Sequence, residues 1–225
     1  MTTANFQKVS TQTLSLRNAP RKIILPPTVA HAVQGVSLES ANDPDHLERG
    51  GAIFARKSGE VRVRLTEVSK VTASPEAMTV DRSARAKDDR LLAEFHSHPR
   101  SAFKREFELS DPPSELDFDH FAKTNDRMIL VTTKGLTYGL LKTAEYDQWW
   151  SSLPKDSATK KPFYQQQLSF AFRLYLHDAR SRHRSFPRAI AIAAMRVAKE
   201  YHIAFYVGGP TTLERIDDRV KNIAP

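Results

Sequence analysis

Residues 91–117 read LLAEFHSHPRSAFKREFELSDPPSELD, and this stretch decides how the rest of the chain is interpreted. The apolar run Leu91–Phe95 predicts a strand that leads into His96 and His98. Side chains at positions i and i+2 of a strand lie on the same face. The two imidazoles are therefore expected to point the same way and to offer two nitrogen ligands to one metal ion. Pro99 cannot donate to a strand ladder, so the strand is expected to stop there.

The carboxyl end of the same stretch predicts the start of a helix. Ser114 is a good N-cap residue, and Asp117 follows three residues later on the first turn. A carboxylate there can complete a site of two histidines and one carboxylate whose fourth position stays open for water, as catalytic zinc requires. Asp111 is a competing ligand, but no serine stands three residues before it, so Asp117 is preferred.

His-Ser-His-Pro followed by Ser-x-x-Asp resembles the signature of the JAB/MPN (JAMM) metalloproteases. That family also has a glutamate upstream, just before a glycine-rich strand start, and Glu48 followed by Gly50-Gly51 fits this place. Fifteen residues, Pro99–Pro113, separate the second histidine from the serine, which is more than the family usually has. We interpret the surplus as an insertion within Arg100–Glu108, which mixes basic and aromatic residues. It is predicted to be a loop that grips the substrate, with an ordinary mobile surface loop as the alternative.

The resemblance implies a role for each candidate residue. His96, His98 and Asp117 would bind zinc. Glu48 would be the general acid/base, and Ser114 would help to hold the oxyanion.

Composition limits the class of protein. The chain has 225 residues, 40% hydrophobic and 27% charged, as in ordinary globular proteins. It has no cysteine, so disulfides and thiolate metal sites are excluded and any metal ligand must be histidine or carboxylate. The N-terminus lacks the apolar core of a signal peptide, and no stretch has the length of a membrane span, so a cytoplasmic protein without a membrane partner is expected.

The net charge of +8 and the pI of about 9.7 allow two kinds of partner. A basic surface can attract nucleic acid or an acidic protein. The sequence shows no helix-turn-helix and no aromatic-basic RNA signature, so specific nucleic-acid binding is disfavoured.

Hydrophobic patterning predicts an α/β fold. Its arrangement is of the α+β type, with a mixed sheet flanked by helices. Strands are expected over 21–25, 52–55, 60–68, 91–95, 127–133 and 136–142, with helices after Pro26 and over 114–124. The segment 127–133 is apolar on both faces, which suits a central strand. JAB/MPN domains, whose architecture is cytidine-deaminase-like, have such a sheet with the site at the strand ends, and the resemblance covers about residues 21–146.

Three parts are expected along the chain. Residues 1–20 are polar and predict a loosely held N-terminal segment. Residues 21–150 form the JAB/MPN domain. Residues 151–225 form a mainly helical C-terminal extension: a polar linker over 151–162, helices over 163–182 and 189–201, and a short strand over 203–207. The extension is expected to add packing or a dimer surface, with recognition of a partner protein as the alternative.

By resemblance, the reaction is hydrolysis of a peptide or isopeptide bond after the terminal glycine of a ubiquitin-like protein. The chain looks like a prokaryotic JAB protein, and such proteins accompany ubiquitin-like, E1-like and E2-like partners, several of them in anti-phage defence operons. Both deconjugation and precursor processing stay open. The other hypotheses are a non-catalytic JAB/MPN scaffold, whose members lose metal ligands, and a nucleic-acid-binding protein whose histidines are structural.

Overall fold

The computed structural model of the chain describes residues 2–45, 47–69, 73, 79–81, 88–98, 112–133, 135–154, 157–182 and 186–216. Pro99, the Arg100–Glu108 insertion and the competing ligand Asp111 lie outside the described residues. The strands are β1 (Thr3–Asn5), β2 (Lys22–Ile24), β3 (Gly50–Ala55), β4 (Val61–Leu65), β5 (Arg90–Ser97), β6 (Met128–Thr133), β7 (Leu136–Lys142), β8 (Ile203–Gly208) and β9 (Thr212–Arg215). The helices are α1 (Phe6–Thr11), α2 (Pro27–Asn42), α3 (Glu115–Lys123), α4 (Ala144–Ser152), α5 (Ser157–Arg182) and α6 (Phe186–Glu200).

The described strands form one nine-stranded sheet in the order β1-β2-β9-β8-β7-β6-β5-β3-β4. It is mixed: β5 and β6 run parallel, whereas β3 is antiparallel to both β4 and β5. The predicted central strand is confirmed, because all six residues of β6 are buried between β5 and β7.

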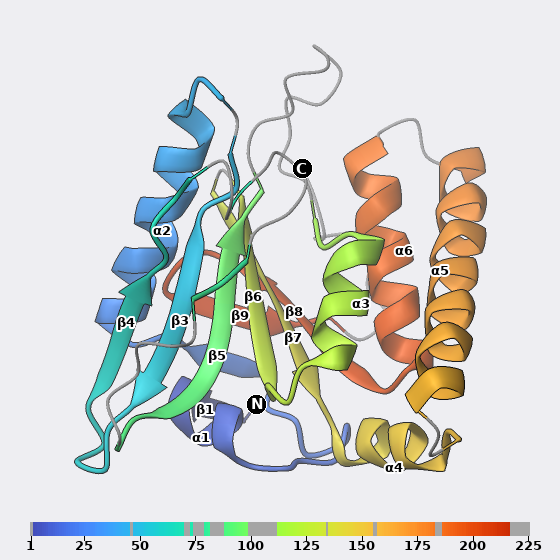
Figure 1. Ribbon diagram of the computed structural model, residues 1–225, viewed down its shortest axis with the longest axis horizontal. Coiled ribbons are helices and arrows are strands. Elements are labelled where there is room, and N and C mark those ends of the chain that lie inside the picture. Colours follow the sequence, from blue (N-terminus) through green and yellow to red (C-terminus); the bar gives the residue numbers. More distant parts are fainter. Residues whose placement is uncertain are drawn as a thin grey trace.

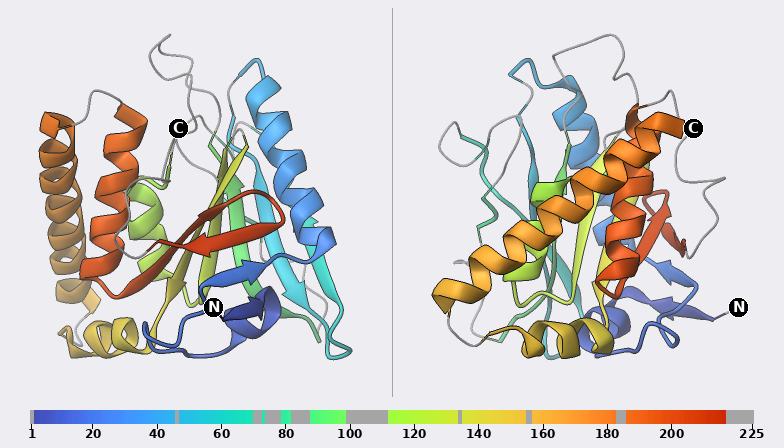
Figure 2. Two further views of the ribbon diagram at one scale, coloured as in Figure 1. Left: turned by 180° about the vertical axis from the view of Figure 1, so that it is seen from behind. Right: turned by 90° about the vertical axis from the view of Figure 1, so that its right-hand side faces the viewer.

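Helices cover both faces of this sheet (Figure 1, Figure 2). One hydrophobic core lies between the sheet and α1 with α2, and includes Phe6, Val33 and Phe95. The other lies between the sheet and α3, α5 and α6, and includes Phe118 and Phe172. The predicted fold, a mixed sheet flanked by helices, is confirmed.

Local sequence signals explain where the first long helix begins and what it buries. Pro27 stands at the N1 position of α2, where its missing N–H costs nothing and its fixed φ suits a helix. Val29, Val33 and Val36 recur at helical spacing and are all buried against the sheet. Among the helices of the described segments, none is both long and apolar enough to cross a membrane.

The N-terminal residues differ from the loose segment expected over 1–20. β1 pairs in parallel with β2, with Ala4 opposite Ile23. Phe6 and Val9, three residues apart on α1, are fully buried. Although the segment is polar overall, burial of these two apolar side chains holds the short helix against the core.

The C-terminal region is mainly helical, as predicted, but it also completes the sheet. β8 pairs with β7 and β9 pairs with β2, so the two strands join the N-terminal strands to the centre of the sheet. The predicted linker 151–162 is shorter than expected, because α5 already begins at Ser157.

Candidate metal centre

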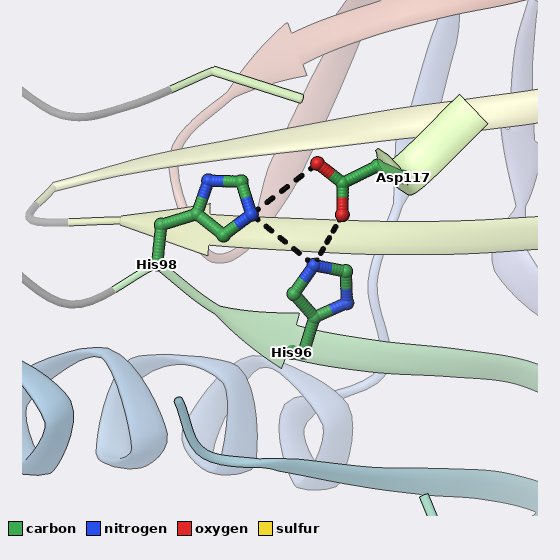
Figure 3. Close-up of side chains that lie close together, drawn as sticks. All are labelled: His96, His98 and Asp117. Atoms are coloured by element: carbon green, nitrogen blue, oxygen red, sulfur yellow. Dashed lines mark hydrogen bonds and ion pairs between the residues drawn. The ribbon is translucent and has the colours of Figure 1, made fainter. Parts of the chain in front are cut away.

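The two candidate histidine ligands lie at the carboxyl end of β5. His96 is in register with Val131 of β6, and the backbone N–H of His98 donates to the carbonyl of Thr132 at 2.8 Å, so parallel pairing continues past the last residue assigned to β5. The ring nitrogens Nε2 of His96 and His98 lie 3.3 Å apart. The i, i+2 rule therefore brings both imidazoles to one point, as predicted (Figure 3).

Asp117 reaches the same point from the first turn of α3. The carboxylate oxygen Oδ1 lies 2.7 Å from Nε2 of His96, and Oδ2 lies 3.3 Å from Nε2 of His98. The amino end of α3 and the carboxyl end of β5 meet at the same edge of the sheet (Figure 1). Separate elements thus supply the three ligand atoms.

Ser114 fixes the start of α3 and holds the Asp117 carboxylate. Its backbone N–H and its hydroxyl donate to Oδ2 of Asp117 at 2.5 and 2.7 Å, while the N–H of Asp117 donates to the Ser114 hydroxyl at 3.4 Å. This is a capping box, with an aspartate in the place usually taken by glutamate. The predicted N-cap is confirmed.

Glu48 is brought to the site by the approach of β3 to β5. The backbone N–H of Arg49 donates to Oγ of Ser97 at 3.1 Å. The backbone N–H of Ser97 donates to the carbonyl of Arg49 at 2.7 Å. Gly50 lies opposite His96, and a Cβ at Gly50 would stand 2.2 Å from the carbonyl oxygen of Phe95. Only glycine allows this separation, so the glycine-rich strand start positions Glu48.

The Glu48 carboxylate is buried and lies 4.0 Å from Nε2 of His98, beyond hydrogen-bond distance. Burial raises the pKa of Glu48, against the opposing attraction of the two histidines. A carboxyl group with a raised pKa beside a metal centre is suited to accept a proton and to give it back.

The pKa values of His96 and Asp117 are shifted in opposite directions. Burial acts to lower the pKa of His96, but the adjacent Asp117 and the nearby Glu48 outweigh it, so that pKa is raised above the ordinary 6.5. Burial alone would raise the pKa of Asp117, yet His98 and His96 together hold it well below its usual value of 3.8. Asp117 is therefore ionised at neutral pH, as a metal ligand must be.

The donor set fits a metal ion. Ligand atoms of His96, His98 and Asp117 all lie within 4.8 Å of one another. Two imidazole nitrogens and a carboxylate oxygen suit zinc and several other first-row divalent ions. Three protein ligands also leave room for a water molecule, which separates catalytic sites from closed structural ones.

Sequence reasoning missed three contacts beside this site: the Arg49–Ser97 pairing, the Thr132 carbonyl, and a hydrogen bond of 2.9 Å between Glu94 on β5 and His120 on α3. The signal for the last was a charged residue inside an otherwise apolar strand. The partner, 26 residues further along the chain, could not be read from spacing.

Comparison with known families agrees with this architecture and donor set. A family model described as prokaryotic homologs of the JAB domain matches residues 31–152, more than half of the chain. The chain therefore belongs to the prokaryotic JAB family, and the resemblance noted in the sequence is confirmed. No curated protein and no solved structure gave a significant match.

Proposed function

We propose that the chain is a zinc-dependent peptidase or isopeptidase that cleaves after the C-terminal glycine of a ubiquitin-like protein. The observation that carries the proposal is that Glu48, His96, His98 and Asp117 meet at one end of the sheet. They come from three separate segments of the chain. Membership of the prokaryotic JAB family supports hydrolysis as the reaction class.

The side chains divide the chemistry between them. His96, His98 and Asp117 would hold zinc, which when bound activates water and polarises the scissile carbonyl. Glu48 would take a proton from the attacking water and pass it to the leaving amine. Its raised pKa favours acceptance of the proton from water and keeps the carboxyl protonated at a higher pH, so the proton is available when the amine leaves.

Ser114 has two roles to reconcile. Family resemblance assigns its hydroxyl to the oxyanion, yet in this conformation the hydroxyl donates to Asp117 at 2.7 Å. A hydroxyl has one proton, so it must leave Asp117 before it can donate to an oxyanion. We therefore propose that Ser114 holds the carboxylate in the resting site and turns to the oxyanion during the reaction.

The completeness of the site favours an enzyme over a scaffold. A non-catalytic scaffold does not need a buried acid/base residue beside a full ligand set. We propose that the substrate is a ubiquitin-like conjugate or precursor in the cytoplasm, with E1-like and E2-like proteins as partners in anti-phage defence. A net charge of +8 suits a partner with an acidic surface.

A substrate trap tests the proposal. Glu48→Gln keeps the side-chain volume but removes the proton acceptor, so the variant should retain bound substrate when it is expressed in its native cell. Mass spectrometry should find a small protein that ends in glycine, alone or joined to a target. Glu60→Gln is the matched control, because Glu60 is an exposed acid on the β3–β4 turn, where it pairs with Arg56. Recovery of nucleic acid alone, or of the same proteins with both variants, would contradict the proposal.

A further inference from the structure

Glu94 is a buried carboxylate that the roles assigned above do not use. It lies on β5, and only 2% of it is exposed. Burying a charged carboxylate is costly unless it is paired. Its Oε2 lies 2.9 Å from Nε2 of His120, which stands on α3 with 52% of its side chain exposed. The pair therefore joins the strand and the helix that carry the metal ligands.

Like the contact between His96 and Asp117, this pair joins a residue of β5 to a residue of α3. It lies two strand residues further from the carboxyl end of β5. Glu94 and His96 are two residues apart on β5 and share one face. Asp117 and His120 are three residues apart on α3 and also share one face. The helix runs opposite to the strand, so Glu94 meets His120 and His96 meets Asp117. Two polar contacts, of 2.9 and 2.7 Å, thus connect the same two elements.

The helix needs such a connection. α3 has nine residues, which is too short to be stable by itself. Its apolar side chains Phe118 and Phe121 are fully buried in the core, but apolar packing has little directionality. A hydrogen bond constrains both distance and angle. Glu94 and His120 can therefore define the rotation and height of the helix where apolar contacts cannot.

We propose that Glu94 and His120 are positioning residues, which set α3 against β5 so that Asp117 is held at the two histidines. The inference rests on the metal-binding part of the proposed function and not on the substrate. Neither residue belongs to the three-residue ligand group. They act through Asp117, as the residues that orient metal ligands do in other metalloproteins.

Zinc affinity is the measurement that tests this inference, by competition with a chromophoric chelator. His120→Asn shortens the side chain so that it cannot reach Glu94, and affinity should fall about 10–100-fold. His120→Gln places an amide near the position of Nε2 and should restore most of it. Lys123→Gln is the matched control: Lys123 lies one turn further along α3, and its ion pair with Asp119 stays within the helix. It should bind zinc like the unmodified chain.

The visible absorption of bound Co²⁺ provides a second readout, which loss of stability alone would not change. We expect His120→Asn to alter this spectrum and His120→Gln to return it towards that of the unmodified chain. Unchanged affinity and spectrum in folded His120→Asn would overturn the inference. If that variant fails to fold, Glu94→Met replaces it, because methionine has a similar length but lacks a strong acceptor for His120: a loss of zinc affinity supports the inference, and unmodified affinity overturns it.

The same titrations separate this inference from the proposed function. An unmodified chain that binds zinc but cleaves no glycine-terminated conjugate would contradict the proposed reaction. The affinity losses of the His120 and Glu94 variants would still support their positioning role. An unmodified chain that binds neither zinc nor Co²⁺ would overturn both, because there would be no ligand geometry to maintain.

Discussion

Nε2 of His96 lies 2.7 Å from Oδ1 of Asp117, and this contact joins the carboxyl end of β5 to the first turn of α3. The two residues are separated in sequence by a segment that lies largely outside the described residues. The spacing in the sequence is longer than the family's usual one, yet the ligand atoms meet. What matters for the site is the relation between the strand and the helix, and the Ser114 capping box maintains it at the helix start.

Removing the carboxylate ligand should abolish tight metal binding. Asp117→Asn replaces a charged oxygen ligand by a neutral amide, so we expect bound zinc to fall from about one ion per chain to near zero after dialysis. Elemental analysis measures this directly. Asp119→Asn, on the same helix, removes an acid that pairs with Lys123 rather than with the site, and it should keep its zinc. Equal zinc content in both variants would show that Asp117 is not a ligand.

Metal affinity should rise with pH. The raised pKa of His96 means that the metal-free site keeps a proton at a pH where a free imidazole, with a pKa of 6.5, has lost it. Metal binding needs the neutral ring, so it must displace that proton. The stabilisation of the metal-free fold by protonated His96 is complete below about pH 6.5 and is lost as the pH rises through the raised pKa.

The gap in melting temperature between zinc-loaded and metal-free protein should therefore widen from pH 5.5 to pH 8. Differential scanning calorimetry at matched ionic strength measures the gap. Asp117 has the opposite sign: its lowered pKa adds stability above about pH 4, which is lost only as the pH falls through that lowered pKa. It is ionised throughout the tested range. A gap that stays constant with pH would mean that no proton is displaced.

The candidate ligands and their local secondary structure could be predicted from the sequence. The contacts between distant residues beside the site could not. Alternation on a strand brings His96 and His98 to one face, and an N-cap predicts that Asp117 lies on the first turn of a helix; both rules depend only on neighbours in sequence. That this turn meets the two histidines was implied by the family resemblance. The contacts beside the site depend on pairings across the fold, such as Arg49 with Ser97 and Glu94 with His120. No periodicity in a single sequence specifies which distant residue completes such a pair.

The same distinction explains the differences in fold. The central strand and the hairpin from β6 to β7 were predictable, because apolar residues and a turn glycine with φ of 87° mark them locally. β1 and β9 have three and four residues and gain their structure from the neighbouring strands. Tertiary pairing outweighs weak local preference in such short elements.

Replacing the proposed acid/base residue should separate catalysis from metal binding. Glu48→Gln should lower kcat by about 10²–10⁴-fold, because the amide cannot accept a proton. Zinc content should be unchanged, since the Glu48 carboxylate is outside the three-residue ligand group. Single-turnover kinetics on a glycine-terminated conjugate, with elemental analysis of the same sample, measure both. A parallel loss of zinc would instead make Glu48 a ligand.

Removing the Ser114 hydroxyl should affect both stability and metal binding. Ser114→Ala loses the N-cap, which costs about 1 kcal/mol, and it removes one donor to Asp117. Thr143→Ala is the matched control, because Thr143 caps α4 by accepting from the N–H of Tyr146. Both variants should unfold at lower urea concentration. Only Ser114→Ala should bind zinc more weakly, and equal zinc affinity in the two would reduce Ser114 to an ordinary cap.

Two glycines provide a paired test of how β3 is held against β5. Gly50→Ala would place a Cβ 2.2 Å from the backbone carbonyl of Phe95, so the strands must separate, and we expect a loss of about 1–3 kcal/mol in the free energy of unfolding. Gly35→Ala, within α2, meets nothing within 4 Å and should add about 0.5–1 kcal/mol. Urea titrations followed by circular dichroism measure both changes.

Because β3 leads directly from Glu48, Gly50→Ala should also slow cleavage, whereas Gly35→Ala should leave it unchanged. A Gly50→Ala variant as stable as the unmodified chain would contradict the close pairing of the two strands and, with it, the way in which Glu48 is positioned.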